Sequence, residues 1–286
     1  MFLTAAGIAV ALVLGLKILV LLVEPRLTFM PVRELPVTPG DLELPFEDAS
    51  ITTDDHLRIH GWFVPAPAHE DRGALRRPLT LLFFHGNAEN IAFNLPLVEL
   101  AHRAGHGLLL VDYRGYGTSE GSPSEAGIYR DGEAALRYLR GRPDVDPGRI
   151  VVWGRSIGAA VAVHLVAGGT GSGSGAPVAG VVLESPFTSA LELLREGGHW
   201  ILYPAALLGS YRFDSARLIG RIAAPLCVVH GTEDEVAPFR LGRRLYDLAA
   251  ARKELVAIEG GGHNDLMARH GDELWAGVSR FLATLD

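Results

Sequence analysis

One serine stands in a sequence context that could make it a nucleophile. Ser156 is the centre of residues 154–158 (Gly-Arg-Ser-Ile-Gly), which follow the apolar run 149–153 and precede the small-residue run 159–163. A strand, a G-x-S-x-G turn and a helix form the pattern of a nucleophile elbow, a sharp turn that exposes the serine hydroxyl. Glycines two positions before and after the serine let the strand and the helix approach without a Cβ clash. The pattern predicts nucleophilic chemistry at Ser156.

A serine hydroxyl needs a base to take its proton and an acid to orient that base. Behind an elbow of this kind the three groups follow in the chain order serine, acid, histidine. After Ser156, Asp234 and His263 fit that order, and each lies in a loop that follows an apolar run, 225–230 or 254–258. Two other acids remain as alternatives to Asp234, namely Glu184 and Asp265. The remaining polar neighbours are interpreted as solvated surface groups: Glu233, Glu235 and His270.

The tetrahedral intermediate of acyl transfer needs two N–H donors aimed at its oxyanion. One is expected from the backbone of Ile157, directly after the serine. The other is expected from the backbone of Asn87, in the His-Gly-Asn turn (85–87) that follows the apolar run 79–84. An ordinary turn from strand to helix, with Asn87 or Asn90 as the helix cap, is the alternative interpretation of the same residues.

These groups can meet only if the loops that carry them lie at the same edge of one sheet. Apolar runs that alternate with amphipathic runs predict parallel strands with helices on both faces, an α/β doubly wound sheet. Two earlier β-type runs, 49–53 and 57–64, predict an antiparallel start. Because ligands bind at the carboxyl ends of parallel strands, the loops with the candidate groups should share one edge. The expected strands are 79–84, 107–112, 149–153, 178–184, 225–230 and 254–258, and the expected helices are 91–103, 123–140, 157–167, 239–251 and 265–285.

Two segments near this edge are expected to support the site. Residues 112–119 alternate aromatic residues and glycine after a strand, which suits a tight loop in which Asp112 and Arg114 make structural hydrogen bonds. Residues 186–224 are too long for a simple connection and are rich in apolar side chains. They are interpreted as a lid-like insertion that lines an acyl pocket, with Tyr203 and Leu207 as candidate substrate contacts. A helix that packs on the body without a further role is the alternative.

The N-terminus differs from the rest of the chain. From residue 2 to residue 23 the only charged side chain is Lys17, and a run of this length can cross a bilayer as a helix. The sequence therefore predicts a transmembrane anchor at 1–23, a proline-rich connector at 24–45 and a catalytic domain at 46–286. This predicts a single-pass membrane protein, and the basic residues that follow the anchor weakly favour a cytoplasmic body. A cleaved signal peptide fits less well, since no basic region precedes the run and no small-x-small site follows it.

Composition and charge narrow the possible partners. A chain of 286 residues with 48% hydrophobic side chains can bury a large core, and its net charge of −7 argues against nucleic acid. His102 and His106 are four residues apart, but Gly105 breaks the helix between them and no third metal ligand is near. No dinucleotide fingerprint follows the first parallel strand. We therefore expect no cofactor and no metal, and a small-molecule or lipid acyl ester as substrate, while the oligomeric state stays open.

Six motifs in a fixed order carry a family resemblance: 85–87, 112–117, 154–158, 184–187, 230–234 and 262–265. They resemble those of α/β-hydrolase-fold serine hydrolases, and are most similar to the membrane-anchored branch of bud-emergence-type proteins and eukaryotic protein depalmitoylases. The resemblance covers about residues 45–285. It implies Ser156 as nucleophile, Asp234 as acid, His263 as base, and ester or thioester hydrolysis through an acyl-enzyme. One departure is that the depalmitoylases carry lipidated cysteines near the N-terminus, where this chain has an apolar run.

Two other functions could use the same fold. A serine aminopeptidase-type peptidase would share the mechanism, but no acidic pair is visible to hold a free amino terminus. A non-catalytic membrane-bound binding protein would not need Ser156, Asp234 and His263 together, because fold stability does not require that set. A dehalogenase would need a carboxylate at the elbow, and Ser156 excludes it. The sequence thus favours hydrolysis of acyl esters or thioesters.

Overall fold

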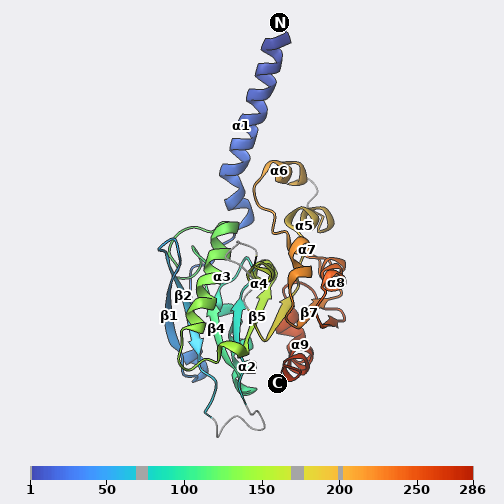
Figure 1. Cartoon of the computed structure of the whole chain (residues 1–286). Coiled ribbons are helices and arrows are strands. Elements are labelled where there is room, and N and C mark those ends of the chain that lie inside the picture. The colour runs from blue at the N-terminus through green and yellow to red at the C-terminus, as the bar shows by residue number, and fades with distance from the viewer. Residues whose placement is uncertain (1, 69–76, 169–176, 199–201, 286) are drawn as a thin grey trace.

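The computed structural model describes residues 2–68, 77–168, 177–198 and 202–285. In these residues an eight-stranded sheet forms the centre of the molecule, with the strand order β1-β2-β4-β3-β5-β6-β7-β8 (Figure 1). β1 and β2 are antiparallel to each other, β2 is antiparallel to β4, and the other neighbours pair in parallel. The predicted fold class, a mostly parallel α/β sheet with antiparallel N-terminal strands, is confirmed. The strands are β1 (Glu47–Thr52), β2 (Arg58–Val64), β3 (Thr80–Phe84), β4 (Gly107–Val111), β5 (Ile150–Arg155), β6 (Gly180–Glu184), β7 (Leu226–Gly231) and β8 (Lys253–Ile258).

The central strands are apolar throughout because helices cover both faces of the sheet. On β5, Val152 points into one core while Val151 and Trp153 point into the other, as the alternation of side chains along a strand requires. The first core is completed by α3 (Glu125–Arg140), α4 (Ile157–Ala167) and α8 (Phe239–Leu248). The second core is completed by α2 (Leu95–Arg103) and α9 (Leu266–Ala283). Strands β3 to β7 are therefore buried along almost their whole length and are rich in apolar side chains, whereas the edge strand β8 is only partly buried.

Shorter elements lie in the connections. Residues 186–224 contain α5 (Ala190–Glu196), α6 (Tyr203–Leu208), α7 (Ser215–Leu218) and the 3-10 turn η6 (Ile219–Arg221), with residues 199–201 outside the described part. Figure 1 places α5 and α6 at the end of the molecule from which the N-terminal helix projects. The other 3-10 turns are η1 (Pro39–Leu42), η3 (Ile91–Asn94) and η4 (Pro147–Arg149).

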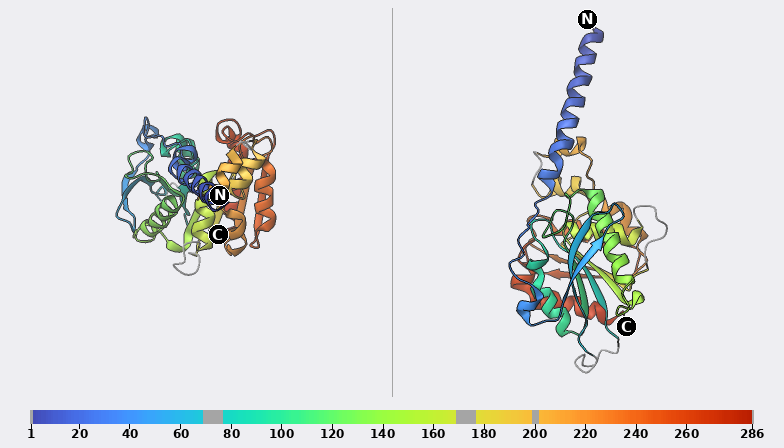
Figure 2. Two further views of the ribbon diagram at one scale, coloured as in Figure 1. Left: turned by 90° about the horizontal axis from the view of Figure 1, so that it is seen from above. Right: turned by 90° about the vertical axis from the view of Figure 1, so that its left-hand side faces the viewer.

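The first helix, α1 (Phe2–Thr28), projects from the body, as the right-hand view of Figure 2 shows. The prediction that residues 2–23 span a membrane, and the single-pass localisation drawn from it, are wrong. Among the residues that the structure describes, no helix is both long enough and apolar enough to span a bilayer. The helix α1 does not stop at residue 23. It continues through Glu24, Pro25 and Arg26, which adds two charges to that of Lys17 within one element.

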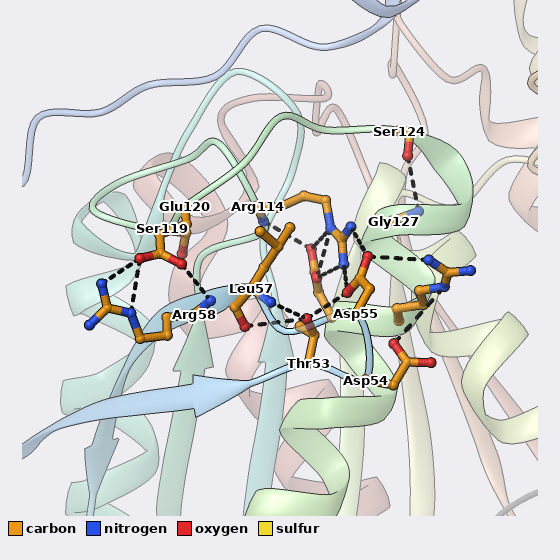
Figure 3. A network of polar contacts seen from close by, with 12 residues as sticks. Thr53, Asp54, Asp55, Leu57, Arg58, Arg114, Ser119, Glu120, Ser124 and Gly127 are labelled. Atoms are coloured by element: carbon orange, nitrogen blue, oxygen red, sulfur yellow. Dashed lines mark hydrogen bonds and ion pairs between the residues drawn. The ribbon is translucent and has the colours of Figure 1, made fainter.

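The loop after β4 is held by a buried arginine, as Figure 3 shows. Arg114 donates to Asp55 Oδ2 and to Asp131 Oδ1, each at 2.8 Å, and so joins the β1–β2 turn to α3. Asp112 accepts the N–H of Ile91 at 3.1 Å, which ties the same loop to η3. The structural hydrogen bonds expected of Asp112 and Arg114 are confirmed. They connect this loop to the segment that follows β3, to the β1–β2 turn and to α3.

Candidate active site

Ser156 lies between β5 and α4 in a strained backbone conformation. Its φ is 53° and its ψ is −116°, a region that residues with a side chain rarely adopt. The two flanking glycines are required by close backbone approach. A Cβ on Gly154 would lie 2.1 Å from the carbonyl oxygen of Gly158, and a Cβ on Gly158 would lie 2.1 Å from that of Phe84. The G-x-S-x-G spacing therefore packs the first turn of α4 against β3 and β5.

The structure brings the three predicted side chains into one hydrogen-bonded chain. His263 Nε2 lies 3.0 Å from Ser156 Oγ, and His263 Nδ1 lies 2.7 Å from Asp234 Oδ2. The Asp234 side chain is fully buried and that of His263 is 7% exposed. Since a carboxylate only accepts hydrogen bonds, Nδ1 carries the proton and Nε2 is left to accept the serine proton. This is the arrangement that a serine nucleophile needs.

Asp234 is held as a carboxylate by four groups. Its Oδ1 accepts the N–H groups of Val236 and Ala237 at 3.0 and 2.7 Å. Its Oδ2 faces both His263 and the buried His230, whose Nε2 lies 3.2 Å away. Burial by itself would raise the pKa of Asp234, but the hydrogen bonds from His230 and His263 outweigh it and hold that pKa well below its ordinary value. His230 was not predicted to contact Asp234, although it is the last residue before the Gly-Thr-Glu-Asp turn.

The histidine loop is built by close backbone contacts at the end of β8. A Cβ on Gly231 would lie 2.1 Å from the carbonyl oxygen of Gly261, so the chain needs glycine at the end of β7 where it crosses the histidine loop. Asp265 Oδ1 accepts the N–H of Gly262 at 2.8 Å, and Glu235 Oε2 accepts the N–H of His263 at 3.4 Å. The Asp265 carboxylate therefore fixes the backbone of the histidine loop through the hydrogen bond from Gly262.

Glu184, the second alternative acid, and His270, the histidine that follows His263 in the chain, do not belong to this hydrogen-bonded series. Glu184 accepts from the indole of Trp153 at 3.1 Å and does not face the histidine ring at hydrogen-bonding distance. His270 lies within α9 at a kink, with φ of −126° and ψ of 20°. The structure therefore assembles Asp234, and neither Glu184 nor Asp265, with His263.

The turn after β3 is held by hydrogen bonds of two of its own side chains, those of Glu89 and Asn87. Glu89 accepts the N–H of Gly86 at 2.5 Å. The Asn87 carboxamide accepts from Tyr116 Oη at 2.7 Å and from the N–H of Met30 at 3.1 Å, and donates to the carbonyl of Thr28 at 2.6 Å.

The helix cap in this region is Asn90. Its side chain accepts the N–H of Ala92 at 3.0 Å at the start of η3. The Asn87 side chain is not used in that way and is instead tied to the chain that leaves α1. The alternative interpretation of the turn as a capped helix start therefore applies to Asn90 and not to Asn87, and the role of the Asn87 backbone as an oxyanion donor stays a prediction.

The candidate substrate contacts lie on α6, which packs against α1 and α5. Tyr203 is half-buried, and the Leu207 side chain is 53% exposed. Single exposed apolar side chains are common on protein surfaces. These two belong to α6, which is part of the predicted lid-like insertion. The roles of Tyr203 and Leu207 as substrate contacts remain predictions.

Two glutamates fasten the chain where it returns from α6. Glu24 of α1 accepts the N–H groups of Ser210 and Tyr211 at 2.8–3.0 Å. Glu125 of α3 accepts those of Arg212 and Phe213 at 2.6 and 2.7 Å. Four consecutive backbone donors are thus held by two carboxylates from different helices. No local sequence pattern could have indicated this, because Glu24 and Ser210 are 186 positions apart.

Comparison with known proteins agrees with this architecture. The family model for the alpha/beta hydrolase fold matches residues 80–218. The Arabidopsis thaliana alpha/beta hydrolase domain-containing protein WAV2 is 34% identical over 299 residues, which cover 96% of this chain and 91% of that protein. A protein of Mycobacterium tuberculosis (strain ATCC 25618 / H37Rv), named as uncharacterized, is 36% identical over 260 residues, or 91% of this chain and 87% of that protein.

Solved structures show the same fold at lower identity. The esterase Pf2001 of Pyrococcus furiosus superimposes with a TM-score of 0.72 at 21% identity, covering 90% of this chain and 97% of that chain. An acetyl xylan esterase from Paenibacillus sp. R4 superimposes with a TM-score of 0.63 at 19% identity, covering 88% and 86%.

Proposed function

Because the chain belongs to the α/β-hydrolase family, we propose that it is a serine hydrolase that cleaves carboxylic esters or thioesters through an acyl-enzyme. The observation that carries this proposal is the hydrogen-bonded series Asp234–His263–Ser156, with 2.7 and 3.0 Å between successive polar atoms. Several fold neighbours are named as esterases, which supports an acyl ester as the substrate. The resemblance of the motifs to depalmitoylase-like proteins supports thioesters as a second substrate class.

In the proposed reaction, Ser156 Oγ attacks the carbonyl carbon while His263 Nε2 takes the hydroxyl proton. The carbonyl oxygen becomes an oxyanion that the N–H groups of Ile157 and Asn87 receive. His263 then gives its proton to the leaving alkoxide or thiolate, and the acyl group stays on Ser156. A water molecule then gives a proton to His263 Nε2 and attacks the acyl-enzyme, and His263 returns that proton to Ser156 Oγ as the bond to the acyl carbon breaks and the carboxylic acid leaves. Asp234 keeps the imidazole in the required tautomer in both halves.

The acyl chain of the substrate would be received by the lid-like insertion 186–224. This assignment is supported by the position of α5 and α6 at the end of the molecule that carries α1, and by the partly exposed apolar side chains of Tyr203 and Leu207. The two carboxylates that hold the return chain, Glu24 and Glu125, would then set how far the insertion can open.

The test is covalent labelling by a fluorophosphonate probe together with hydrolysis of p-nitrophenyl acyl esters. The parent protein should be labelled and active, whereas Ser156→Ala should lose the label and lower kcat by about 10⁶-fold. A matched Ser279→Ala variant, in the C-terminal part of α9, should behave as the parent does. If Ser156→Ala labels as well as the parent, Ser156 is not the nucleophile.

The same assay separates the alternatives. Faster release from aminoacyl p-nitroanilides than from acyl esters would indicate a peptidase of the serine aminopeptidase type. A folded protein that is not labelled and turns over neither substrate would indicate a binding protein.

A further inference from the structure

The residue before the serine is at the centre of a buried charge cluster. Arg155 is 13% exposed, and its Nη1 donates to Glu89 Oε2 at 2.8 Å. Its Nε lies 3.5 Å from Glu184 Oε1. Its Nη2 donates to the backbone carbonyl of His263 at 3.3 Å. One planar guanidinium therefore has an acceptor at each of its three nitrogens, which a lysine ammonium on a flexible stem cannot reproduce.

Each of these acceptors belongs to a different part of the site. Glu89 uses its other oxygen to hold the N–H of Gly86, directly before the expected oxyanion donor. The backbone carbonyl of Glu184 accepts the N–H of Ser156 at 2.8 Å. The third acceptor is the main chain of the proposed base itself.

We propose that Arg155 is a positioning residue that holds the oxyanion turn, the serine elbow and the histidine loop in the mutual geometry that the reaction needs. This inference rests on the proposed serine hydrolase function. A displacement of about 1 Å between reacting groups is enough to slow catalysis about a hundredfold. Because Arg155 contacts three segments around the site and is not one of the proposed reacting groups, its loss should lower kcat while KM changes little.

The charge of Arg155 gives the proposal a second consequence. Burial disfavours the charged guanidinium, but the carboxylates of Glu89, Glu184 and Asp234 raise the pKa of Arg155 above its ordinary value, so it stays a cation. This cation adds positive potential at the histidine loop, and its removal would leave the loop more negative. The groups that face the loop with opposite sign, from four segments, are Glu89, Glu184, Asp234, Glu235 and Asp265.

Two decisive variants change the net charge near the histidine loop in opposite directions. Arg155→Gln should lower kcat about a hundredfold and move the acidic limb of the kcat/KM–pH profile upward by about one pH unit. Glu89→Gln keeps an acceptor for Gly86 but removes a negative charge, so it should move the same limb toward lower pH. Arg155→Lys should return the limb to its parental position while kcat recovers only in part, since an ammonium cannot serve three acceptors.

A second buried arginine provides the matched control. Arg114 also joins two carboxylates, Asp55 and Asp131, but contacts no part of the proposed triad. Arg114→Gln should lower the midpoint of thermal unfolding and leave the acidic limb where the parent has it. A shift shared by both arginine variants would overturn the positioning role, because general loosening would then explain it.

The outcomes also separate this inference from the proposed function. If Ser156→Ala is inactive but folded Arg155→Gln keeps the parental kcat and pH limb, only the role of Arg155 is wrong. If Ser156→Ala is as active as the parent, the proposed function itself is wrong. Should Arg155→Gln fail to fold, Arg155→Lys and Glu89→Gln decide, and parental kcat and pH limbs in both would overturn the inference.

Discussion

Ser156, His263 and Asp234 acquire their proposed chemistry from their surroundings. The serine hydroxyl is presented by a backbone conformation that costs about 1–3 kcal/mol, which the packing of Gly154 and Gly158 must sustain. Asp234 combines complete burial with two backbone N–H donors and two imidazoles. The sequence order and the loop positions were enough to select these three residues. The second imidazole, His230, depended on how β7 and its turn pack and could not be selected from spacing.

Replacing the acid should remove most of the rate without unfolding the protein. Asp234→Asn should lower kcat for a p-nitrophenyl ester about 10⁴-fold, because an amide can donate to Nδ1 and so favours the wrong imidazole tautomer. Steady-state kinetics at the plateau pH measure the loss, and near-ultraviolet circular dichroism checks the fold. Parental kcat in a folded variant would show that Asp234 does not orient the base.

The same carboxylate makes stability depend on pH with a defined sign. The pKa of Asp234 is lowered in the folded state, so its ionised form stabilises the fold above the ordinary carboxyl value of 3.8. This stabilisation is lost as the pH falls through that value toward the lowered pKa. When the pH is lowered from about 5 to about 3, the free energy of unfolding measured with urea should therefore decrease more in the parent than in Asp234→Asn. Equal losses in the two proteins would show that Asp234 carries no such linkage.

At the scale of elements, glycine spacing and apolar periodicity were reliable because they act locally. The run 157–167 was predicted as a helix and forms α4 with those bounds, since it begins at the elbow and ends at Gly168 in a left-handed conformation. The helix predicted at 91–103 divides into η3 and α2 because Asn90 caps the first turn and Pro96 restarts the helix near its N-terminus. Such divisions depend on cap geometry, which residue patterns locate only to within a few residues.

The contact between α4 and β3 is a test at this scale. Gly158→Ala should lower the free energy of unfolding by about 3 kcal/mol and reduce activity, because its Cβ would meet backbone atoms that cannot move aside. Gly141→Ala is the matched control at the end of α3, where the nearest atoms are 3.6 Å from the added Cβ and φ is −82°. Urea denaturation measures both. Equal stability of the two variants would contradict the tight approach at the elbow.

At the scale of the whole molecule, the chain that leaves α1 contacts the site on two sides. Thr28 and Met30 hold the Asn87 carboxamide, while Glu24 holds the return chain at Ser210. Phe29 is buried between them, with its ring 5.6 Å from that of Tyr211. The N-terminal segment, interpreted from sequence as a separate anchor and connector, is therefore bonded to both the turn after β3, which carries the proposed oxyanion donor Asn87, and the insertion 186–224.

This connection predicts a local loosening when Glu24 is removed. Glu24→Ala should speed amide hydrogen exchange at residues 210 and 211 by about tenfold or more, because hydrogen bonds to a charged group contribute about 1.5–3 kcal/mol. Glu99→Ala, which removes an exposed carboxylate from α2, is the control and should leave those residues unchanged. Exchange mass spectrometry on the 205–214 segment measures the effect. Unchanged exchange in Glu24→Ala would mean that Glu125 alone holds the return chain.

The sequence by itself determined the sheet, the elbow and the order of serine, acid and histidine, because hydrophobic period and glycine spacing act between near neighbours. Tertiary structure alone decided that Arg155 meets Glu89 across 66 positions and that Glu24 meets Ser210 across 186. It also decided that the first helix runs to Thr28 with three charged side chains, where composition had suggested a membrane span ending at residue 23. Contacts between residues so far apart in the chain depend on how the helices and strands pack against one another. No pattern within either segment indicates its partner.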